Sequence, residues 1–220
     1  MIKLDISPEL LEQALRHRSA LAANDIYQRL DSNERLEFLG DAVLELATTN
    51  FLYQKFTQEL EGTLTSYRSA LVKTTTLARV ARKLEIGEAI IMSKGEAESG
   101  GRDNDGLLAD TFEALVGALY LNAGFAAVES FLHEHLFVEF DTILKKGTYK
   151  DAKSELQEMV QANDLAAPTY RVVEERGPDH DKEFTVAVRI DGKATATGIG
   201  KSKQQAQQDA AEKALKAYKT

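Results

Sequence analysis

The sequence predicts a two-domain protein, with an all-α domain followed by a small α+β domain of element order α-β-β-β-α. Apolar residues recur with the 3.6-residue period of helices through residues 1–146, where strand signals are absent. Beyond the polar stretch 147–150 the period changes to two. At 220 residues the chain is long enough for two domains that each bury a core. We expect domains at residues 1–146 and 151–220, with 147–150 as the linker.

Apolar periodicity and capping residues define the helices of the first domain. They are predicted at residues 7–17, 34–60, 65–84, 107–123 and 125–144. Ser7 and Pro8 supply an N-cap and a proline at the first helical position. Any of the three residues 31–33 can cap the second helix, and Gly124 ends the fourth. Residues 93–106, which are polar and contain several glycines, are predicted to form a mobile loop or a region of short turns.

The second domain combines two helices with three strands. A helix is predicted at 152–163, and strands at 169–175, 184–190 and 193–199, with Asp191-Gly192 as a hairpin turn. Ser202 caps a final helix. The residues expected on its buried side are Ala206, Ala210, Ala214 and Tyr218.

The second predicted helix has an acidic front and an apolar back. Its acidic stripe consists of Glu34, Glu37, Asp41 and Glu45, and its apolar side of Leu36, Leu39, Val43 and Ala47. Side chains three and four apart are neighbours on a helix, so unpaired carboxylates at this spacing repel one another. The front is therefore either a solvated face or, if it lines a cleft, one wall of a divalent metal site.

A second acidic pair strengthens the metal hypothesis. Asp110 and Glu113 share one face of the helix 107–123, and Gly117 on that side permits close approach of another backbone. Together with Glu37 and Asp41 they make four carboxylates, which cations would stabilise. Two Mg²⁺ ions could then activate a water and stabilise the leaving oxygen of a phosphodiester. The alternative is that the two helices do not face each other.

Composition limits the chemistry. The chain has no cysteine and its four histidines are widely spaced, which excludes thiolate sites and a zinc motif and leaves oxygen ligands for Mg²⁺ or Mn²⁺. No apolar run approaches the roughly 20 residues of a membrane helix, and no secretory signal opens the chain. We therefore expect a cytoplasmic protein without a membrane partner.

Charge is unevenly distributed. The formal net charge is −8, but residues 1–149 hold 15 basic and 23 acidic residues whereas residues 150–220 hold 12 of each. Beyond Gly192 there are six lysines and two acidic residues. Such a local basic region is sufficient to bind a phosphate backbone.

The motifs resemble those of the ribonuclease III family. Residues 33–41, Asn-Glu-Arg-Leu-Glu-Phe-Leu-Gly-Asp, match its signature residue for residue, and residues 108–115 resemble its second acidic motif. Residues 14–19 and 61–62 look like further landmarks. The resemblance covers essentially the whole chain, including a double-stranded-RNA-binding domain. It implies a homodimer without a small-molecule cofactor that cleaves double-stranded RNA with Mg²⁺, leaving 5′-phosphate and 3′-hydroxyl ends with short 3′ overhangs. Processing of ribosomal, messenger and other structured RNA precursors is the implied role.

The resemblance also assigns roles in the first domain. It implies that Glu37, Asp41, Asp110 and Glu113 are catalytic metal ligands. Glu34 would assist at the cleft, and Glu61 would line it from the other subunit. Phe38 falls on the acidic front, where a large apolar ring gains nothing from water; the resemblance implies that it packs into the partner subunit. The alternative for Phe38 is a chance exposed aromatic.

In the second domain the resemblance implies RNA contacts from Gln157, His180, Lys201 and Lys203. The first two would reach successive minor grooves and the lysines the intervening phosphates. A lysine-bearing helix can also be a solvated surface. The sequence departs from the family at Gln204, where a second basic residue is usual, which predicts weaker and less salt-sensitive binding. It departs again at Gly106, usually serine, where Asn104 or Asp105 can cap the helix.

Two other functions stay open at this stage. One is a protein that binds duplex RNA without cutting it, which four intact candidate ligands argue against. The other is a phosphohydrolase acting on small nucleotides, for which residues 150–220 would be dispensable.

Overall fold

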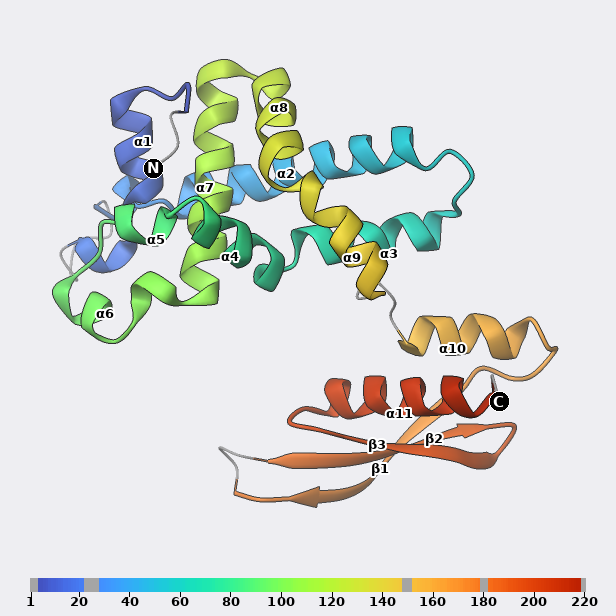
Figure 1. Ribbon diagram of the computed structural model, residues 1–220. Coiled ribbons are helices and arrows are strands. Elements are labelled where there is room, and N and C mark those ends of the chain that lie inside the picture. Colours follow the sequence, from blue (N-terminus) through green and yellow to red (C-terminus); the bar gives the residue numbers. More distant parts are fainter. Residues whose placement is uncertain (1–3, 22–27, 148–151, 179–181, 219–220) are drawn as a thin grey trace. The chain divides into compact units, whose positions relative to one another are not determined.

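The chain divides into two compact units, Met1–Tyr149 and Lys150–Thr220, in a computed structural model that describes residues 4–21, 28–147, 152–178 and 182–218 (Figure 1). The first unit is helical and the second is α+β, as the sequence predicts. No helix among the described residues is long and apolar enough to cross a membrane.

In the helical unit, five of the other helices (α1, α2, α4, α5 and α8) pack against a buried helix, α7 (Asp105–Ala123). Its fully buried side chains include Leu108, Phe112 and Val116. The remaining α-helices are α1 (Pro8–Leu15), α2 (Glu34–Lys55), α3 (Glu61–Val72), α4 (Thr74–Lys83), α5 (Ile86–Ala89), α6 (Lys94–Glu98), α8 (Phe125–His135) and α9 (Phe140–Lys146). Short 3₁₀ turns are η1 (Arg18–Ala20), η2 (Gln28–Asp31), η3 (Gly101–Asp103) and η4 (Phe137–Glu139). Figure 1 shows α2 crossing α7, and the two helices are in direct contact.

Several predicted helix limits were wrong. The helix expected to end at residue 60 ends at Lys55, and the next begins at Glu61. The segment 65–84 is two helices, because Lys73 is extended (φ −64°, ψ 146°) and the buried Thr76 hydroxyl donates to the Ala70 carbonyl at 2.9 Å. A run of three threonines after Lys73 also disfavours continuation of the helix.

The segment 125–144 is likewise interrupted, by η4. There the Phe137 ring stacks on Phe51 at 4.1 Å between centroids, while the buried Glu139 carboxylate accepts a hydrogen bond from Arg79 at 2.9 Å. The expected loop 93–106 contains α6 and η3, and α7 begins before it ends. Asn104, one of the two expected caps, accepts the Leu107 N–H at 3.1 Å.

The second unit has the predicted order of helix, three strands and helix. Its elements are α10 (Ala152–Gln161), β1 (Thr169–Arg176), β2 (Glu183–Ile190), β3 (Lys193–Gly200) and α11 (Lys203–Tyr218). The strands form an antiparallel sheet in the order β1-β2-β3, and α10 and α11 lie together on one face of it (Figure 1). Asp191 and Gly192 take the positive φ values of a tight hairpin turn, 49° and 73°.

Small residues allow α11 to lie close to the sheet. Gly198 on β3 faces the α11 backbone, where a Cβ would lie 2.1 Å from the Ala210 nitrogen. Ser202 caps α11, as expected, by accepting the Gln205 N–H at 3.2 Å. Tyr218 was wrongly expected to be buried and is 46% exposed, because α11 ends at that residue and its last buried side chain is Leu215.

Candidate functional site

The candidate site lies where α2 and α7 cross at two glycines. A Cβ on Gly40 would lie 1.8 Å from the carbonyl oxygen of Glu113, and one on Gly117 would lie 2.3 Å from the carbonyl oxygen of Leu36. Only glycine allows such an approach, since real Cβ contacts are not found below 3.0 Å. The two acidic helices therefore face each other with their backbones in contact, and Gly117 has the role expected of it.

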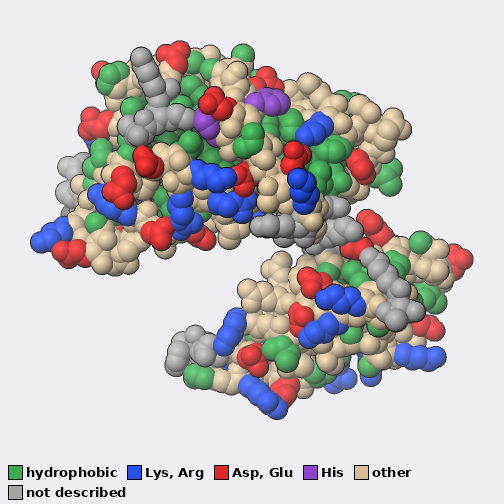
Figure 2. Space-filling view, viewed as in Figure 1, with side chains coloured by type: hydrophobic (Ala, Val, Ile, Leu, Met, Phe, Trp, Pro, Cys, Tyr) green, Lys and Arg blue, Asp and Glu red, His purple; other side chains and the backbone are tan. Residues whose placement is uncertain are grey.

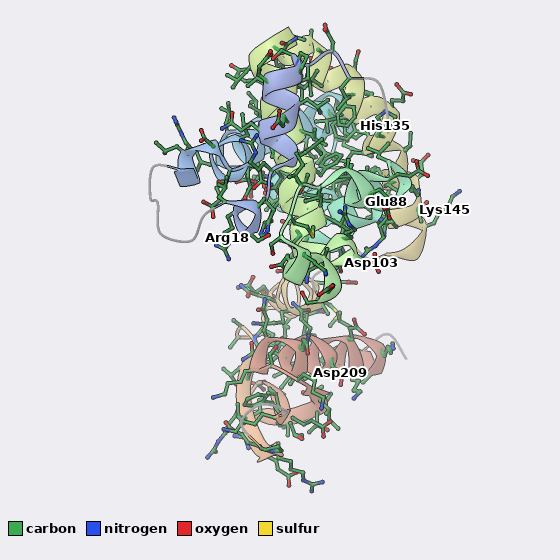
Figure 3. The ribbon with its side chains drawn as sticks, turned by 90° about the vertical axis from the view of Figure 1, so that its left-hand side faces the viewer. Arg18, Glu88, Asp103, His135, Lys145 and Asp209 are labelled. Carbon is green, nitrogen blue, oxygen red and sulfur yellow. The ribbon has the colours of Figure 1, made fainter. Side chains whose placement is uncertain are left out.

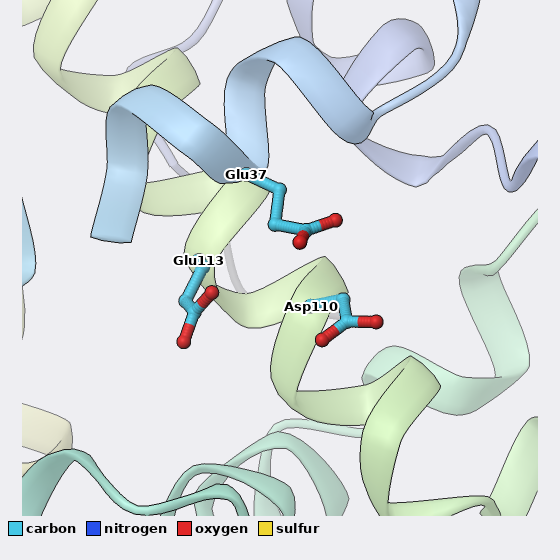
Figure 4. Close-up of side chains that lie close together, drawn as sticks. All are labelled: Glu37, Asp110 and Glu113. Atoms are coloured by element: carbon cyan, nitrogen blue, oxygen red, sulfur yellow. The ribbon is translucent and has the colours of Figure 1, made fainter. Parts of the chain in front are cut away.

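The close crossing brings three carboxylates together. Glu37 extends from α2, and Asp110 and Glu113 extend from α7 into the same space (Figure 4). One oxygen of each lies within 4.8 Å of the others. All three side chains are half-buried. Oxygen atoms at this separation, in a set composed only of carboxylates, fit a hard divalent cation such as Mg²⁺ or Mn²⁺.

The electrostatics of the cluster disfavour three ionised groups. Burial raises the pKa of Glu113 to about 8, and the nearby charges of Asp41, Asp110 and Glu37 add to this rise. Burial and then the charge of Asp110 raise the pKa of Glu37. Burial also raises the pKa of Asp110, against the opposing charges of His17 and Arg18. A divalent cation would remove the conflict.

Asp41 lies one turn beyond Glu37 on α2 and is exposed. The close three-carboxylate group among the described residues does not include it. Its charge is nevertheless the first of those that raise the Glu113 pKa. Asp41 therefore flanks the cluster on the Glu113 side.

A cleft of about 360 Å³ opens beside the cluster. Its lining includes Glu37 and Asp110 of the cluster, together with His17, Arg18 and Glu34. The Glu34 carboxylate accepts hydrogen bonds from Arg18 Nη1 and Ser32 Oγ, each at 3.4 Å. Glu34 thus lies at the cleft, where the resemblance implied it would be. Figure 3 labels Arg18 at the surface of the helical unit.

Glu61 lies apart from the cluster of its own chain, at the start of α3. It lines a different pocket of about 430 Å³, together with Tyr53, Leu64 and Arg68. Phe38 is 83% exposed on α2. At about 100° per residue, the exposed Phe38, Leu46 and Tyr53 fall within about 80° of arc on that helix. These three side chains form an exposed apolar stripe along α2, with Glu45 and Thr49 between them.

In the second unit, Gln157 is exposed on α10, and Lys201 and Lys203 are exposed at the start of α11. Lys203 Nζ lies 3.4 Å from the Glu175 carboxylate on β1 and 5.5 Å from the centre of the Phe184 ring. His180 lies outside the described residues. Figure 2 shows basic and acidic side chains interspersed over the visible face of each unit.

Sequence reasoning gave no role to three residues that shape the site. Gly40 lies inside the signature, yet the need for glycine there depends on a helix about 70 residues away. His17 and Arg18 fall within a family landmark that assigned them no role. His17 caps η1 and Arg18 is the first residue of that turn, and nothing in their local pattern indicates a cleft wall.

Comparisons with known proteins agree on both units. A family model described as Ribonuclease-III-like matches residues 7–140, and one described as double-stranded RNA binding motif matches residues 152–218. Ribonuclease 3 of Geobacillus sp. (strain WCH70) is 44% identical over 216 residues, which cover 96% of this chain and 85% of that protein. Ribonuclease 3 of Pelotomaculum thermopropionicum is 45% identical over 206 residues, which cover 94% of this chain and 85% of that protein. The solved nuclease domain of ribonuclease III from Campylobacter jejuni is 39% identical, with a TM-score of 0.52, over 57% of this chain and 82% of that chain.

Proposed function

Because this chain belongs to the ribonuclease III family, we propose that it is an endoribonuclease that hydrolyses phosphodiester bonds in double-stranded RNA. The observation that carries this proposal is the group of three half-buried carboxylates at the α2–α7 crossing. A second unit that matches a double-stranded RNA binding motif supports the choice of substrate.

Glu37, Asp41, Asp110 and Glu113 would hold the metal, Mg²⁺ or in its place Mn²⁺. When bound, two such ions would supply a water of lowered pKa and neutralise charge on the phosphate and on the departing oxygen. The protein sets the spacing of the carboxylates, because Gly40 and Gly117 allow the backbones of the two helices to pack in direct contact. The Glu113 carboxyl has a pKa of about 8. It would have to lose its proton to become a metal ligand. Products would carry 5′-phosphate and 3′-hydroxyl ends with short 3′ overhangs.

The apolar stripe on α2 supports a homodimer. The solved C. jejuni nuclease domain has a region involved in dimer formation. In a two-fold dimer each copy uses the same surface, so Phe38 of one copy would enter the pocket beside Tyr53 and Leu64 of the other, and the reverse. Glu61 lines that pocket. Since Phe38 follows Glu37, such a contact would bring Glu61 close to the carboxylates of the second copy.

The second unit would hold the duplex. Gln157 and His180 would reach minor grooves, and Lys201 and Lys203 would meet the phosphates between them. Its part in the activity would be binding alone, since the carboxylate cluster lies in the other unit. Ribosomal and messenger RNA precursors in the cytoplasm would be the cellular substrates.

Duplex RNA incubated with Mg²⁺, and in parallel with EDTA, tests the proposal. Wild type should cut only with Mg²⁺, and Glu113→Gln should cut at least ~100-fold more slowly while it still binds the duplex. Glu98→Gln removes one exposed carboxylate outside the cleft and should cut at the wild-type rate. If wild type binds duplex RNA but does not cut it under Mg²⁺, the protein is a binding protein and the nuclease assignment is wrong.

A further inference from the structure

Part of the cleft wall carries hydrogen-bond donors, although the site is otherwise acidic. His17 and Arg18 line the cleft of about 360 Å³ together with Glu37 and Asp110. The Arg18 charge is close enough to lower the pKa values of both acids against the effect of burial. Residues proposed as metal ligands and residues that can donate hydrogen bonds thus line the same cleft.

The segment that carries these donors is fixed by bonds to two distant segments. His17 N–H donates to the Ile91 carbonyl at 2.9 Å, and Ile91 N–H donates to the Leu15 carbonyl at 2.8 Å. Ser93 N–H donates to Ser19 Oγ at 3.0 Å. Asn33 N–H, at the entrance to α2, donates to the Arg16 carbonyl at 2.9 Å. The wall is therefore held in place before any ligand binds.

Both side chains can donate into the cleft. His17 Nδ1 lies 2.8 Å from Ser19 Oγ and accepts the Ser19 backbone N–H at 3.3 Å. When Nδ1 is the acceptor in both contacts, the ring proton of the neutral form is on Nε2. The Arg18 side chain is 59% exposed, and its contact with Glu34, at 3.4 Å, is long for a charge-assisted bond. A ligand with stronger acceptors can displace that contact.

We propose that His17 and Arg18 form a binding subsite for a backbone phosphate of the RNA strand that is cut. This inference rests on the proposed function. Three carboxylates repel the phosphates of an approaching duplex, and a metal at the cluster offsets only the charge next to it. An arginine beside the cluster supplies two parallel donors for the oxygens of a neighbouring phosphate, with the Nε2–H of His17 as a third. Glu34 holds the guanidinium at the cleft until RNA replaces it.

Single-turnover cleavage of a duplex by the full chain under Mg²⁺ tests the subsite. Arg18→Gln should raise the enzyme concentration at half-saturation about 10-fold, the effect of losing one hydrogen bond to a charged group. The rate at saturation should stay within about 2-fold of wild type, because the contact is present before and during the reaction. Arg18→Lys keeps the charge but lacks the two parallel N–H donors of the guanidinium, and it should recover part of the lost affinity.

Binding without cleavage provides an independent measurement. With Glu113→Gln as the parent, adding Arg18→Gln should reduce the slope of log affinity against log salt by about 0.9, the effect of one lost phosphate contact. Arg35→Gln is the matched control: it removes the same charge from an exposed position on α2 that does not line the cleft. It should change neither quantity.

The subsite is excluded if Arg18→Gln leaves half-saturation and the salt slope unchanged, or behaves as Arg35→Gln does. It is also excluded if Glu34→Gln raises half-saturation as much as Arg18→Gln, because Arg18 would then act only through its ion pair. If wild type cuts the duplex and Arg18→Gln behaves like wild type, the subsite is refuted while the proposed function stands. If wild type does not cut, the proposed function is refuted. The salt slope of duplex binding then still shows whether Arg18 contacts a phosphate.

Discussion

Neutralising Glu113 should make the metal-free protein more stable at high pH. The folded pKa of this carboxyl, about 8, lies above its ordinary value of 4.5 because of burial and the charges of Asp41, Asp110 and Glu37. A raised pKa means that the folded state binds the proton more tightly than the unfolded state. The stability from the neutral form is therefore complete below pH 4.5, and is lost as the pH rises from 4.5 to about 8.

The magnitude follows from the size of the shift. Without screening, the change from 4.5 to about 8 corresponds to about 5 kcal/mol. Glu113 is only half-buried, so solvent screening reduces this to about 1–2 kcal/mol. In EDTA at pH 9, Glu113→Gln should thus unfold in urea with a free energy about 1–2 kcal/mol above wild type. At pH 4.5 the gain should be small.

Glu45→Gln is the control for this measurement. Glu45 lies on α2 as well, and its charge is the last of those that raise the Glu113 pKa. Its carboxylate pairs with Arg68 at 2.8 Å, so its loss should lower stability by up to about 1 kcal/mol. Adding Mg²⁺ should stabilise wild type more than Glu113→Gln. If Glu113→Gln is no more stable than wild type at pH 9, or gains equally at both pH values, repulsion within the cluster is not the cause and the reasoning is refuted.

Three further predictions concern packing, assembly and RNA binding. Gly40→Ala should lower the free energy of unfolding in urea by about 3 kcal/mol, because the added Cβ would lie 1.8 Å from a backbone oxygen. Gly95→Ala is the control, since a Cβ there has no atom within 4 Å, and it should not destabilise the protein. Equal effects of the two substitutions would contradict the close crossing. Phe38→Ala should weaken the proposed dimer in sedimentation by about 1.5–3 kcal/mol per buried ring, and unchanged association would show that the ring is simply exposed. Glu175→Gln removes the ion pair of Lys203, so duplex affinity measured by fluorescence anisotropy should rise about 2-fold and depend more steeply on salt. An unchanged salt slope would argue against a phosphate contact from Lys203.

The parts of the fold that depend on local pattern could be predicted from the sequence. The three strands, the Asp191-Gly192 turn and the Ser202 cap are set by residues within a few positions of one another. The break before Phe140 could not be predicted, because it depends on contacts such as the pair of Glu139 with Arg79, 60 positions away. Helical period reports which face is apolar, but not where a helix is interrupted by its neighbours.

The candidate site divides in the same way. Spacing places Asp110 and Glu113 on one face, whereas their meeting with Glu37 depends on how closely α2 and α7 approach. The place of His17 and Arg18 in the cleft wall could not be predicted from the sequence, because bonds from residues 91 and 93 fix the chain around His17. Ile91 and Ser93 are uncharged, and nothing in the sequence around them indicates a contact with His17 or Ser19.

Packing and metal binding are coupled at the crossing of α2 and α7. Repulsion among the carboxylates tends to separate the helices, while burial of apolar side chains behind them, such as Leu36, Leu44 and Phe112, holds them together. Gly40 and Gly117 allow that burial to be complete. A Cβ on Gly40 would require the backbones to separate by more than an ångström, because it would lie 1.8 Å from an oxygen and real contacts stay above 3.0 Å. The carboxylates move with their helices, so the same substitution that loosens the core should also weaken metal binding.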